Sequence, residues 1–205
     1  MKGTIKKITL ASMGPISFVM TTIALAALPY PRGWYIDGNV GESNVNNTSF
    51  GAGTSTTTKN SGFGLNVNGG YKFLPYFALE VGYTRFSTFD ITFNNATIAK
   101  EEPYDYDITT KIILPIQDSG FNLYSKVGVA RISSKIVIND SATISANNLD
   151  IVSGYSYKTG LLYGVGGEYF FSPRFGVHVS WIEVTGSSQT GNLALASVGF
   201  TGLFG

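Results

Sequence analysis

Residues 61–86 read SGFGLNVNGGYKFLPYFALEVGYTRF, in which bulky apolar residues alternate with small or polar ones on both sides of Pro75. Successive side chains of a strand point to opposite sides, so this pattern predicts two strands joined by a turn. In the second strand, Leu79 and Val81 belong to the apolar face, whereas Glu80 belongs to the small and polar face. The hairpin therefore separates an apolar environment from a confined or wet one.

The composition indicates which face points outward. Only 13% of the residues are charged, against roughly a quarter in ordinary soluble proteins. The polar faces carry Gly, Asn, Ser and Thr, which would make a poorly solvated exterior. They suit the crowded lumen of a narrow barrel whose bulky face is turned toward lipid. A soluble barrel or sandwich alternates with the same period and remains an alternative at this point.

The N-terminus begins with lysines and continues into an apolar run over residues 16–28. This run is shorter than the roughly 20 residues that cross a bilayer as a helix, and its basic flank is typical of export. We therefore expect a cleaved signal peptide over residues 1–26 and a single barrel domain over residues 27–205. The chain has no cysteine, so disulfides and thiolate metal sites are excluded.

Segments with the two-residue period recur along the rest of the chain. Eight of them are found, over about residues 34–42, 61–73, 77–86, 104–114, 122–133, 155–171, 175–184 and 192–204. The connectors alternate between short, proline-containing ones and others that are mostly longer and rich in Asn, Ser and Thr. Short turns at one end and long loops at the other are typical of a membrane barrel. We therefore predict an all-β fold, an eight-stranded antiparallel up-and-down transmembrane β-barrel.

Aromatic residues support this interpretation. They gather beside the short turns, as at Phe73 and Tyr76, and near the long loops, as at Tyr104 and Tyr157. Two aromatic girdles are expected at the two interfaces of a membrane. Because eight strands leave a lumen about filled by side chains, a wide pore is not expected.

Four segments resemble the successive hairpins of the OmpA-like eight-stranded outer-membrane barrel family: GGYKFLPYFALEVGY, TTKIILP, LYSKVGVA and YGVGGEYFFSPRFGVHVSW. The resemblance covers most of the expected mature chain. It implies export to the outer membrane of a Gram-negative cell. It does not extend to the family's peptidoglycan-binding domain, so we expect no tethering to the cell wall.

The resemblance also implies a charged network inside the barrel, formed here by Glu80, Lys111, Lys126, Glu168 and His178. The two-residue period independently predicts that all five point inward. His178 stands where the family usually has an arginine, and a histidine is only partly charged near neutral pH. Two interpretations are open. The charges could pair to stabilise the closed barrel, or they could serve as a proton or small-ion gate.

Several partners are expected for such a chain. They are the lipid and lipopolysaccharide of the outer membrane and the barrel-assembly machinery. Outer-membrane barrels that resemble this chain usually end on an aromatic residue, which the assembly machinery recognises. Here Phe204 is followed by Gly205, so this recognition signal is weakened. A host-surface ligand could be reached only through the loops, chiefly residues 43–60 and 134–153. No basic stripe is present, so nucleic acid is not expected.

No group of residues in the sequence has the pattern of a catalytic site. We therefore expect that the protein is not an enzyme and that it has no catalytic residue, no cofactor and no metal. One pair deserves a test, because His178 and Ser180 resemble the His-x-Ser pair of outer-membrane lipid A deacylases. The acidic residue that follows, Glu183, belongs to the opposite face, and an esterase base needs an orienting acid. We therefore expect a structural or surface-interacting barrel, with a narrow conduit for small apolar molecules as the alternative and a lipid A hydrolase as a minor one.

Overall fold

The structure, a computed structural model, describes residues 32–46, 56–58, 61–93, 96–116, 119–138, 154–186 and 191–204. The expected signal peptide lies outside these residues. The strands are β1 (Gly33–Asn46), β2 (Thr56–Thr58), β3 (Ser61–Leu74), β4 (Phe77–Arg85), β5 (Phe89–Phe93), β6 (Ala96–Ile116), β7 (Phe121–Ile138), β8 (Gly154–Phe170), β9 (Phe175–Val184) and β10 (Asn192–Phe204). No helix in the described part of the chain is long and apolar enough to cross a membrane.

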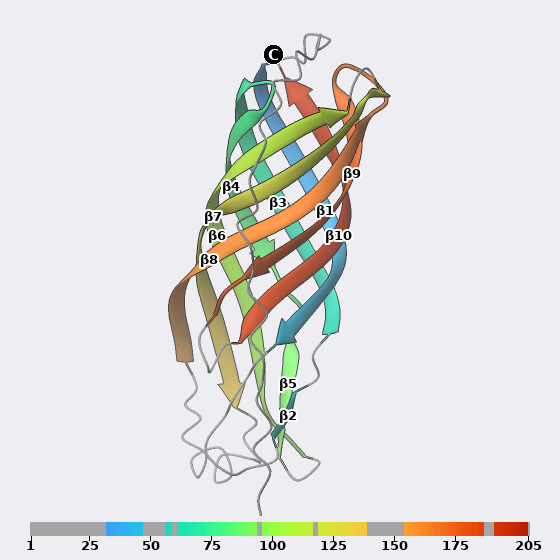
Figure 1. The fold of residues 1–205 in the computed structure, drawn as a ribbon. Coiled ribbons are helices and arrows are strands. Elements are labelled where there is room, and N and C mark those ends of the chain that lie inside the picture. Colours follow the sequence, from blue (N-terminus) through green and yellow to red (C-terminus); the bar gives the residue numbers. More distant parts are fainter. Residues whose placement is uncertain are drawn as a thin grey trace, which may run out of the picture.

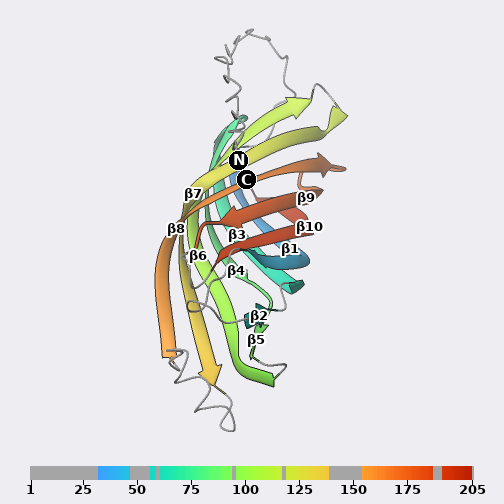
Figure 2. The ribbon, with the colours of Figure 1, turned by 60° about the horizontal axis from the view of Figure 1, so that its bottom comes forward.

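Eight strands close into a barrel, in the order β1-β3-β4-β6-β7-β8-β9-β10 (Figures 1 and 2). Every neighbouring pair is antiparallel, and β1 pairs with β10 from Trp34 opposite Phe204 to Asn46 opposite Asn192. Closure leaves no unpaired edge in the wall, so the backbone polar groups are satisfied without water. The predicted eight-stranded antiparallel barrel is confirmed.

The opening hairpin adopts the predicted faces. Val67 lies opposite Tyr83 and Gly70 opposite Glu80, with a bulge between Lys72 and Leu74. Val81 on the outward face is 59% exposed, whereas Glu80 on the inward face is 1% exposed. The exposed apolar side chains of all eight strands form the outer wall.

The region between β4 and β6 differs from the sequence prediction, which treated residues 87–103 as a loop. It contains the strand β5, which pairs with the outer end of β6 from Phe89 opposite Glu101 to Phe93 opposite Ala96. The short strand β2 pairs with β5 in turn. The physical reason is that β6 extends beyond β4 and would otherwise leave an unpaired edge, which β5 covers. The loops expected at 43–60 and 134–153 are likewise partly strand, because β1, β2 and β7 extend into them.

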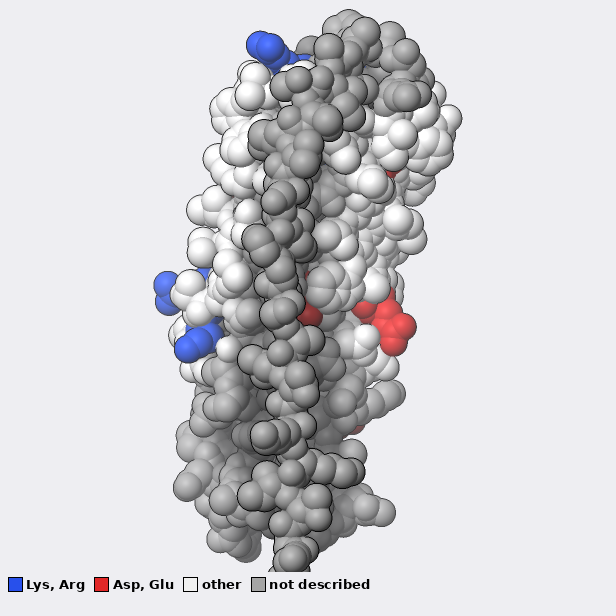
Figure 3. Space-filling view, in the orientation of Figure 1, with Lys and Arg blue, Asp and Glu red and all other residues white. Residues whose placement is uncertain are grey.

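Charged side chains are unevenly distributed along the outer wall. Figure 3 shows, on the face that it displays, a broad band of uncharged described residues below the end that carries the short turns, followed by basic and acidic residues at one level. Exposed Ile108, Val129 and Val165 belong to the uncharged wall. The band has the character expected of a surface that faces lipid.

Candidate functional site

The candidate site is the interior of the barrel, where the structure buries all five sequence-predicted polar residues. Four of them form two ion pairs. Lys111 Nζ lies 2.7 Å from Glu168 Oε2, and Lys126 Nζ lies 2.7 Å from Glu80 Oε2. The sequence indicated that these side chains share the lumen, but not which base pairs with which acid.

Glu80 is held by groups from three other strands. The Tyr35 hydroxyl donates to Glu80 Oε1 at 2.6 Å, and the Thr109 hydroxyl donates to Oε2 at 3.3 Å. Together with Lys126, these contacts satisfy both oxygens of a fully buried carboxylate. A buried ion pair requires such additional hydrogen bonds, because Coulomb attraction alone does not offset the loss of hydration.

The second ion pair is enclosed by aromatic and amide groups. Lys111 Nζ lies 4.2 Å from the centroid of the Tyr124 ring, a cation–π contact. The Asn122 amide donates to Glu168 Oε1 at 3.0 Å. Tyr124 has the same parity on β7 as inward Lys126, but nothing in the sequence indicates that its ring covers Lys111.

A layer of amide side chains is hydrogen-bonded to His178 through Asn39. Asn68 donates to Asp37 Oδ1 at 2.6 Å and to Asn66 Oδ1 at 2.6 Å. Asn39 also donates to Asn66 Oδ1, at 2.8 Å. Amide groups donate and accept at once, so they extend the network without adding charge.

His178 forms no ion pair with a described residue. Its Nε2 contacts the side-chain oxygen of Asn39, and its Nδ1 lies 3.0 Å from the Thr201 hydroxyl. A neutral ring that is protonated at Nε2 satisfies both contacts, as a donor to Asn39 and an acceptor from Thr201. Neutral His178 is therefore satisfied by two hydrogen bonds. An arginine at this position would carry a charge and would need an acidic partner.

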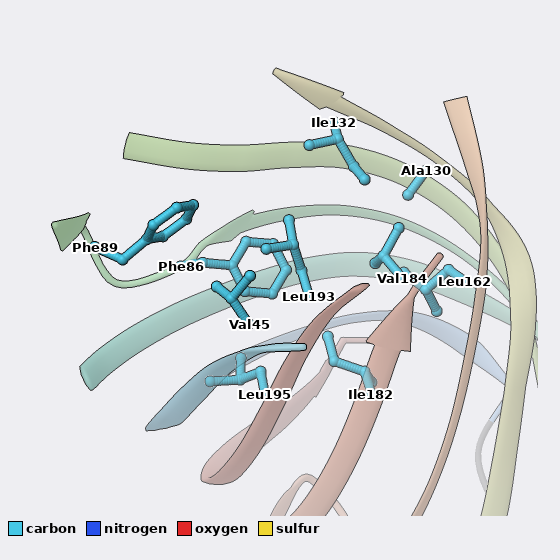
Figure 4. Packing of buried hydrophobic residues seen from close by; sticks show 10 residues of the cluster. All are labelled: Val45, Phe86, Phe89, Ala130, Ile132, Leu162, Ile182, Val184, Leu193 and Leu195. Carbon is cyan, nitrogen blue, oxygen red and sulfur yellow. The ribbon is translucent and has the colours of Figure 1, made fainter. Parts of the chain in front are cut away.

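The outer half of the lumen contains a large apolar cluster, contrary to the expectation of a small or wet interior throughout (Figure 4). The cluster, which we call the outer apolar layer, lies beside buried polar residues such as Ser43 and Asp105 and consists of Val45, Phe86, Phe89, Ala130, Ile132, Leu162, Ile182, Val184, Leu193 and Leu195. Toward the short turns, Tyr35, Ala78 and Leu203 form a second buried cluster with Phe170 packed against it. The polar network thus lies between two apolar clusters.

The cavity left between these clusters is small. It has a volume of about 10 Å³, and Asn66, Asp107, Lys126, Leu162 and Ile182 contribute to its lining. That is room for about one water molecule. The described side chains therefore pack closely in this part of the lumen, as expected for eight strands.

Further acidic residues on β6 were not among the predicted site residues. Glu101, Asp105 and Asp107 are all buried. Glu101 accepts a hydrogen bond from the Ser134 hydroxyl, and its other oxygen has no hydrogen-bond partner among the described atoms. It lies on the extension of β6 beyond the uncharged band, where burial raises its pKa to about 7. Glu101 has inward parity on β6, but the sequence pattern predicts a loop at residues 87–103 and so gives no parity there.

The His178–Ser180 pair lacks the arrangement of a hydrolase. The Ser180 hydroxyl is hydrogen-bonded to the Ser197 hydroxyl at 2.8 Å, and both histidine nitrogens are occupied elsewhere. The Glu183 carboxylate accepts from Asn192 at 2.9 Å. A nucleophile needs its base within hydrogen-bond reach. Among the described residues, no group of three or more His, Cys, Asp or Glu side chains could hold a metal ion.

Comparison with known protein families agrees with this architecture. The model of the outer membrane protein beta-barrel domain matches residues 16–201, which is most of the chain. The chain belongs to this family. It is accordingly a protein of the bacterial outer membrane, and its closed antiparallel barrel is the family's fold.

Solved structures of outer-membrane proteins share the fold at low sequence identity. Neisserial surface protein A has a TM-score of 0.60 at 14% identity, covering 84% of this chain and 97% of that one. The outer membrane protein OprG of Pseudomonas aeruginosa has a TM-score of 0.60 at 12% identity, covering 87% and 100%. The attachment invasion locus protein Ail of Yersinia pestis has a TM-score of 0.50 at 16% identity, covering 85% and 100%. No curated protein sequence gives a significant match.

Proposed function

We propose that this outer-membrane barrel is a closed structural protein that supports the envelope and presents its long loops to the cell's surroundings. The observation that carries the proposal is the filled lumen. Apolar clusters pack on both sides of the polar network, and the cavity beside Lys126 and Asp107 has a volume of only about 10 Å³. An ion would have to lose its hydration to pass through such closely packed side chains, which is strongly unfavourable.

The five-residue lumen network then has a structural role. Glu80, Lys111, Lys126 and Glu168 neutralise one another in pairs, and His178 fixes the position of Asn39. Because each contact joins different strands, the network favours one register of the closed barrel. This interpretation takes the place of a proton or small-ion gate.

Conductance measurements test the closed lumen. The protein reconstituted in planar bilayers should give no stable stepwise current, while a large porin in the same bilayers serves as the positive control. Stepwise currents that change size in Lys111→Gln would contradict the proposal. They would favour the gate instead, because the altered residue lies inside the lumen.

Deletion of the gene tests the envelope role. A deletion strain should become more sensitive to detergent, and expression of the intact barrel should restore resistance. A variant in which residues 139–153 are replaced by a short turn should restore detergent resistance to the same extent. If host-cell attachment depends on the loops, this variant should fail to restore attachment, as the attachment role named for Ail suggests. Unchanged detergent sensitivity of the deletion strain would contradict the envelope role.

A conduit for small apolar molecules is the second candidate, and one observation favours it. An apolar hollow of about 630 Å³ lies on the wall, with Val40, Phe121, Val177, Val198 and Phe200 among its lining residues. The ladder between β8 and β9 beside it is continuous, so a molecule in the hollow would remain outside the lumen. Uptake of an apolar dye that is lost in Val198→Trp and kept in Val81→Trp would establish the conduit. Equal uptake in both variants and in the deletion strain would rule it out.

A further inference from the structure

Basic and tyrosine side chains gather on the outward face of β4, β6, β7 and β8, toward the long loops. We call this surface the basic–tyrosine patch and define it by six residues: Arg85, Tyr104, Tyr106, Arg131, Lys135 and Tyr157. Strand register makes the patch continuous. Arg85 lies opposite Tyr104 and Tyr106 lies opposite Arg131. Tyr157 lies opposite Ser133, two residues along β7 from Arg131.

The side chains of the patch contact one another directly. The Arg131 guanidinium carbon lies 5.4 Å from the centroid of the Tyr157 ring. The rings of Tyr104 and Tyr106 meet edge to face, with centroids 5.9 Å apart. These contacts hold the arginine against an aromatic surface while its donor groups stay exposed.

The basic groups of the patch are available to an outside ligand. Arg85, Arg131 and Lys135 are exposed, and none of them forms an ion pair with a carboxylate in the described part of the chain. Glu102 is the register partner of Lys135, and the next acidic residue along the same side, Asp90, lies opposite exposed Lys100. Three basic groups against one acidic group leave the surface positive.

The opposite side of the barrel carries charges of the other sign. Toward the outer ends of β1 and β9, Glu42 is exposed and Glu183 is partly exposed. Figure 3 shows basic groups on the side of the barrel where Figure 1 places β4, β6, β7 and β8, and acidic groups on the other side at the same level. The charge is therefore localised on one side and does not form a uniform ring.

The position of the patch along the barrel axis identifies which part of the membrane it contacts. Exposed Ile108 and Val129 lie one pleat closer to the short turns than Tyr106 and Arg131. A membrane strand crosses the apolar core in about 9–11 residues, and β7 reaches Arg131 at about that length from Phe121. The patch thus begins where the apolar band ends, at the headgroups of the outer leaflet, because the long loops of such barrels are extracellular.

We propose that the basic–tyrosine patch binds the phosphate groups of lipopolysaccharide, the phosphorylated glycolipid of the outer leaflet. The guanidinium groups of Arg85 and Arg131 can each donate two parallel hydrogen bonds to a phosphate, and Lys135 adds a point charge. The tyrosines contribute apolar rings toward the acyl chains and hydroxyl groups toward the sugar, as amphipathic residues do at membrane interfaces.

A charge-removal variant tests this proposal on the intact barrel in detergent or lipid nanodiscs. In the triple variant Arg85→Gln, Arg131→Gln, Lys135→Gln, the affinity for purified lipopolysaccharide should fall roughly tenfold to a hundredfold, since each basic side chain contributes to binding of an anionic lipid surface. The matched control is Arg174→Gln, which removes an exposed basic residue at the short-turn end. Heat-modifiable gel mobility verifies that each variant is folded.

Three ligands distinguish the source of the phosphate. Wild-type barrel should bind lipopolysaccharide tightly, dephosphorylated lipopolysaccharide weakly and phosphatidylglycerol vesicles weakly. Equal binding of the dephosphorylated form would overturn the proposal, as would an equal loss in the Arg174→Gln control. Equal binding of phosphatidylglycerol would reduce the patch to a general anionic-lipid surface. Stronger binding of a sulfated polysaccharide such as heparin would assign the patch to a soluble polyanion instead.

Discussion

Lys111 and Lys126 lie directly opposite each other on β6 and β7, yet their ammonium groups contact different carboxylates. Lys111 reaches Glu168 on β8, and Lys126 reaches Glu80 on β4. Two like charges on facing residues repel each other, so each lysine depends on its own acid. The barrel wall brings the two acids to opposite sides of the lysine pair, and this arrangement leads to the first prediction.

Glu80→Gln should destabilise the barrel by about 3–5 kcal/mol, because it leaves Lys126 buried without its counter-charge. The double variant Glu80→Gln, Lys126→Met should recover much of this loss, since it removes the unpaired charge as well. Urea unfolding in detergent micelles, followed by tryptophan fluorescence, measures both. Glu42→Gln on the outer wall is the control, and a loss no larger than in this control would show that the ion pair does not stabilise the fold.

Leu193→Ala should destabilise the barrel by about 2–5 kcal/mol, because it opens a cavity in the outer apolar layer. Leu193 is fully buried there. The control is Leu123→Ala, which shortens an exposed leucine on the outer wall and should cost less in the same unfolding experiment. Equal losses at the two positions would mean that the outer half of the lumen is not tightly packed.

Gly128→Ala should impair folding, because a Cβ atom there would lie 2.1 Å from the Ile108 carbonyl oxygen on β6. The backbone of a paired strand cannot yield by that much without breaking the ladder. Gly69→Ala is the matched control, since a Cβ at Gly69 meets nothing within 4 Å. The fraction of heat-modifiable, folded protein measures the effect. A normal folded fraction for Gly128→Ala would indicate that β6 and β7 lie further apart than described.

The pairing of β5 with β6 should weaken as the pH rises through about 7, because burial raises the pKa of Glu101 from 4.5 to about 7. The sign follows from proton binding. Between these two values the folded state holds the proton that the unfolded state has lost, so stability is full below pH 4.5 and declines toward alkaline pH. The loss reaches at most about 3.5 kcal/mol, at about 1.4 kcal/mol for each pKa unit. It should appear as faster amide hydrogen exchange in β5, after correction for the intrinsic pH dependence of exchange.

Glu101→Gln should remove this pH dependence, because an amide does not titrate. The exchange of strands β9 and β10, which do not contact β5 in the barrel order, serves as the internal reference. An equal pH response in the Glu101→Gln variant would assign the effect to another group.

The inward direction of Glu80, Lys111, Lys126, Glu168 and His178 was predictable from the sequence. The direction of a strand side chain depends only on its position along the strand, and tight turns and long loops mark the strand ends. The pairing of these five residues was not predictable. Glu168 meets Lys111 only because β8 and β6 flank β7 at a particular stagger, which the closure of the whole barrel sets.

The outer apolar layer also escaped prediction. Leu162, Ile182 and Leu193 have inward parity. In a chain whose composition indicates a membrane barrel, however, apolar residues are expected on the lipid-facing side, and the pattern alone does not indicate that some of them fill the lumen. Short strands over loop segments were missed for a related reason. β5 forms only because the extended edge of β6 lies beside it. The sequence of β5 itself does not indicate that such an edge is nearby.

By itself, the sequence of this protein determined an exported eight-stranded barrel with a bulky face toward lipid, because alternation and connector length are local properties of the chain. Tertiary structure alone decided which acid meets which lysine, that apolar clusters lie on both sides of the polar network, and that three basic residues from two strands, β4 and β7, belong to one outward patch. These features depend on distances between strands, and such distances exist only after the barrel has closed with one register and one stagger.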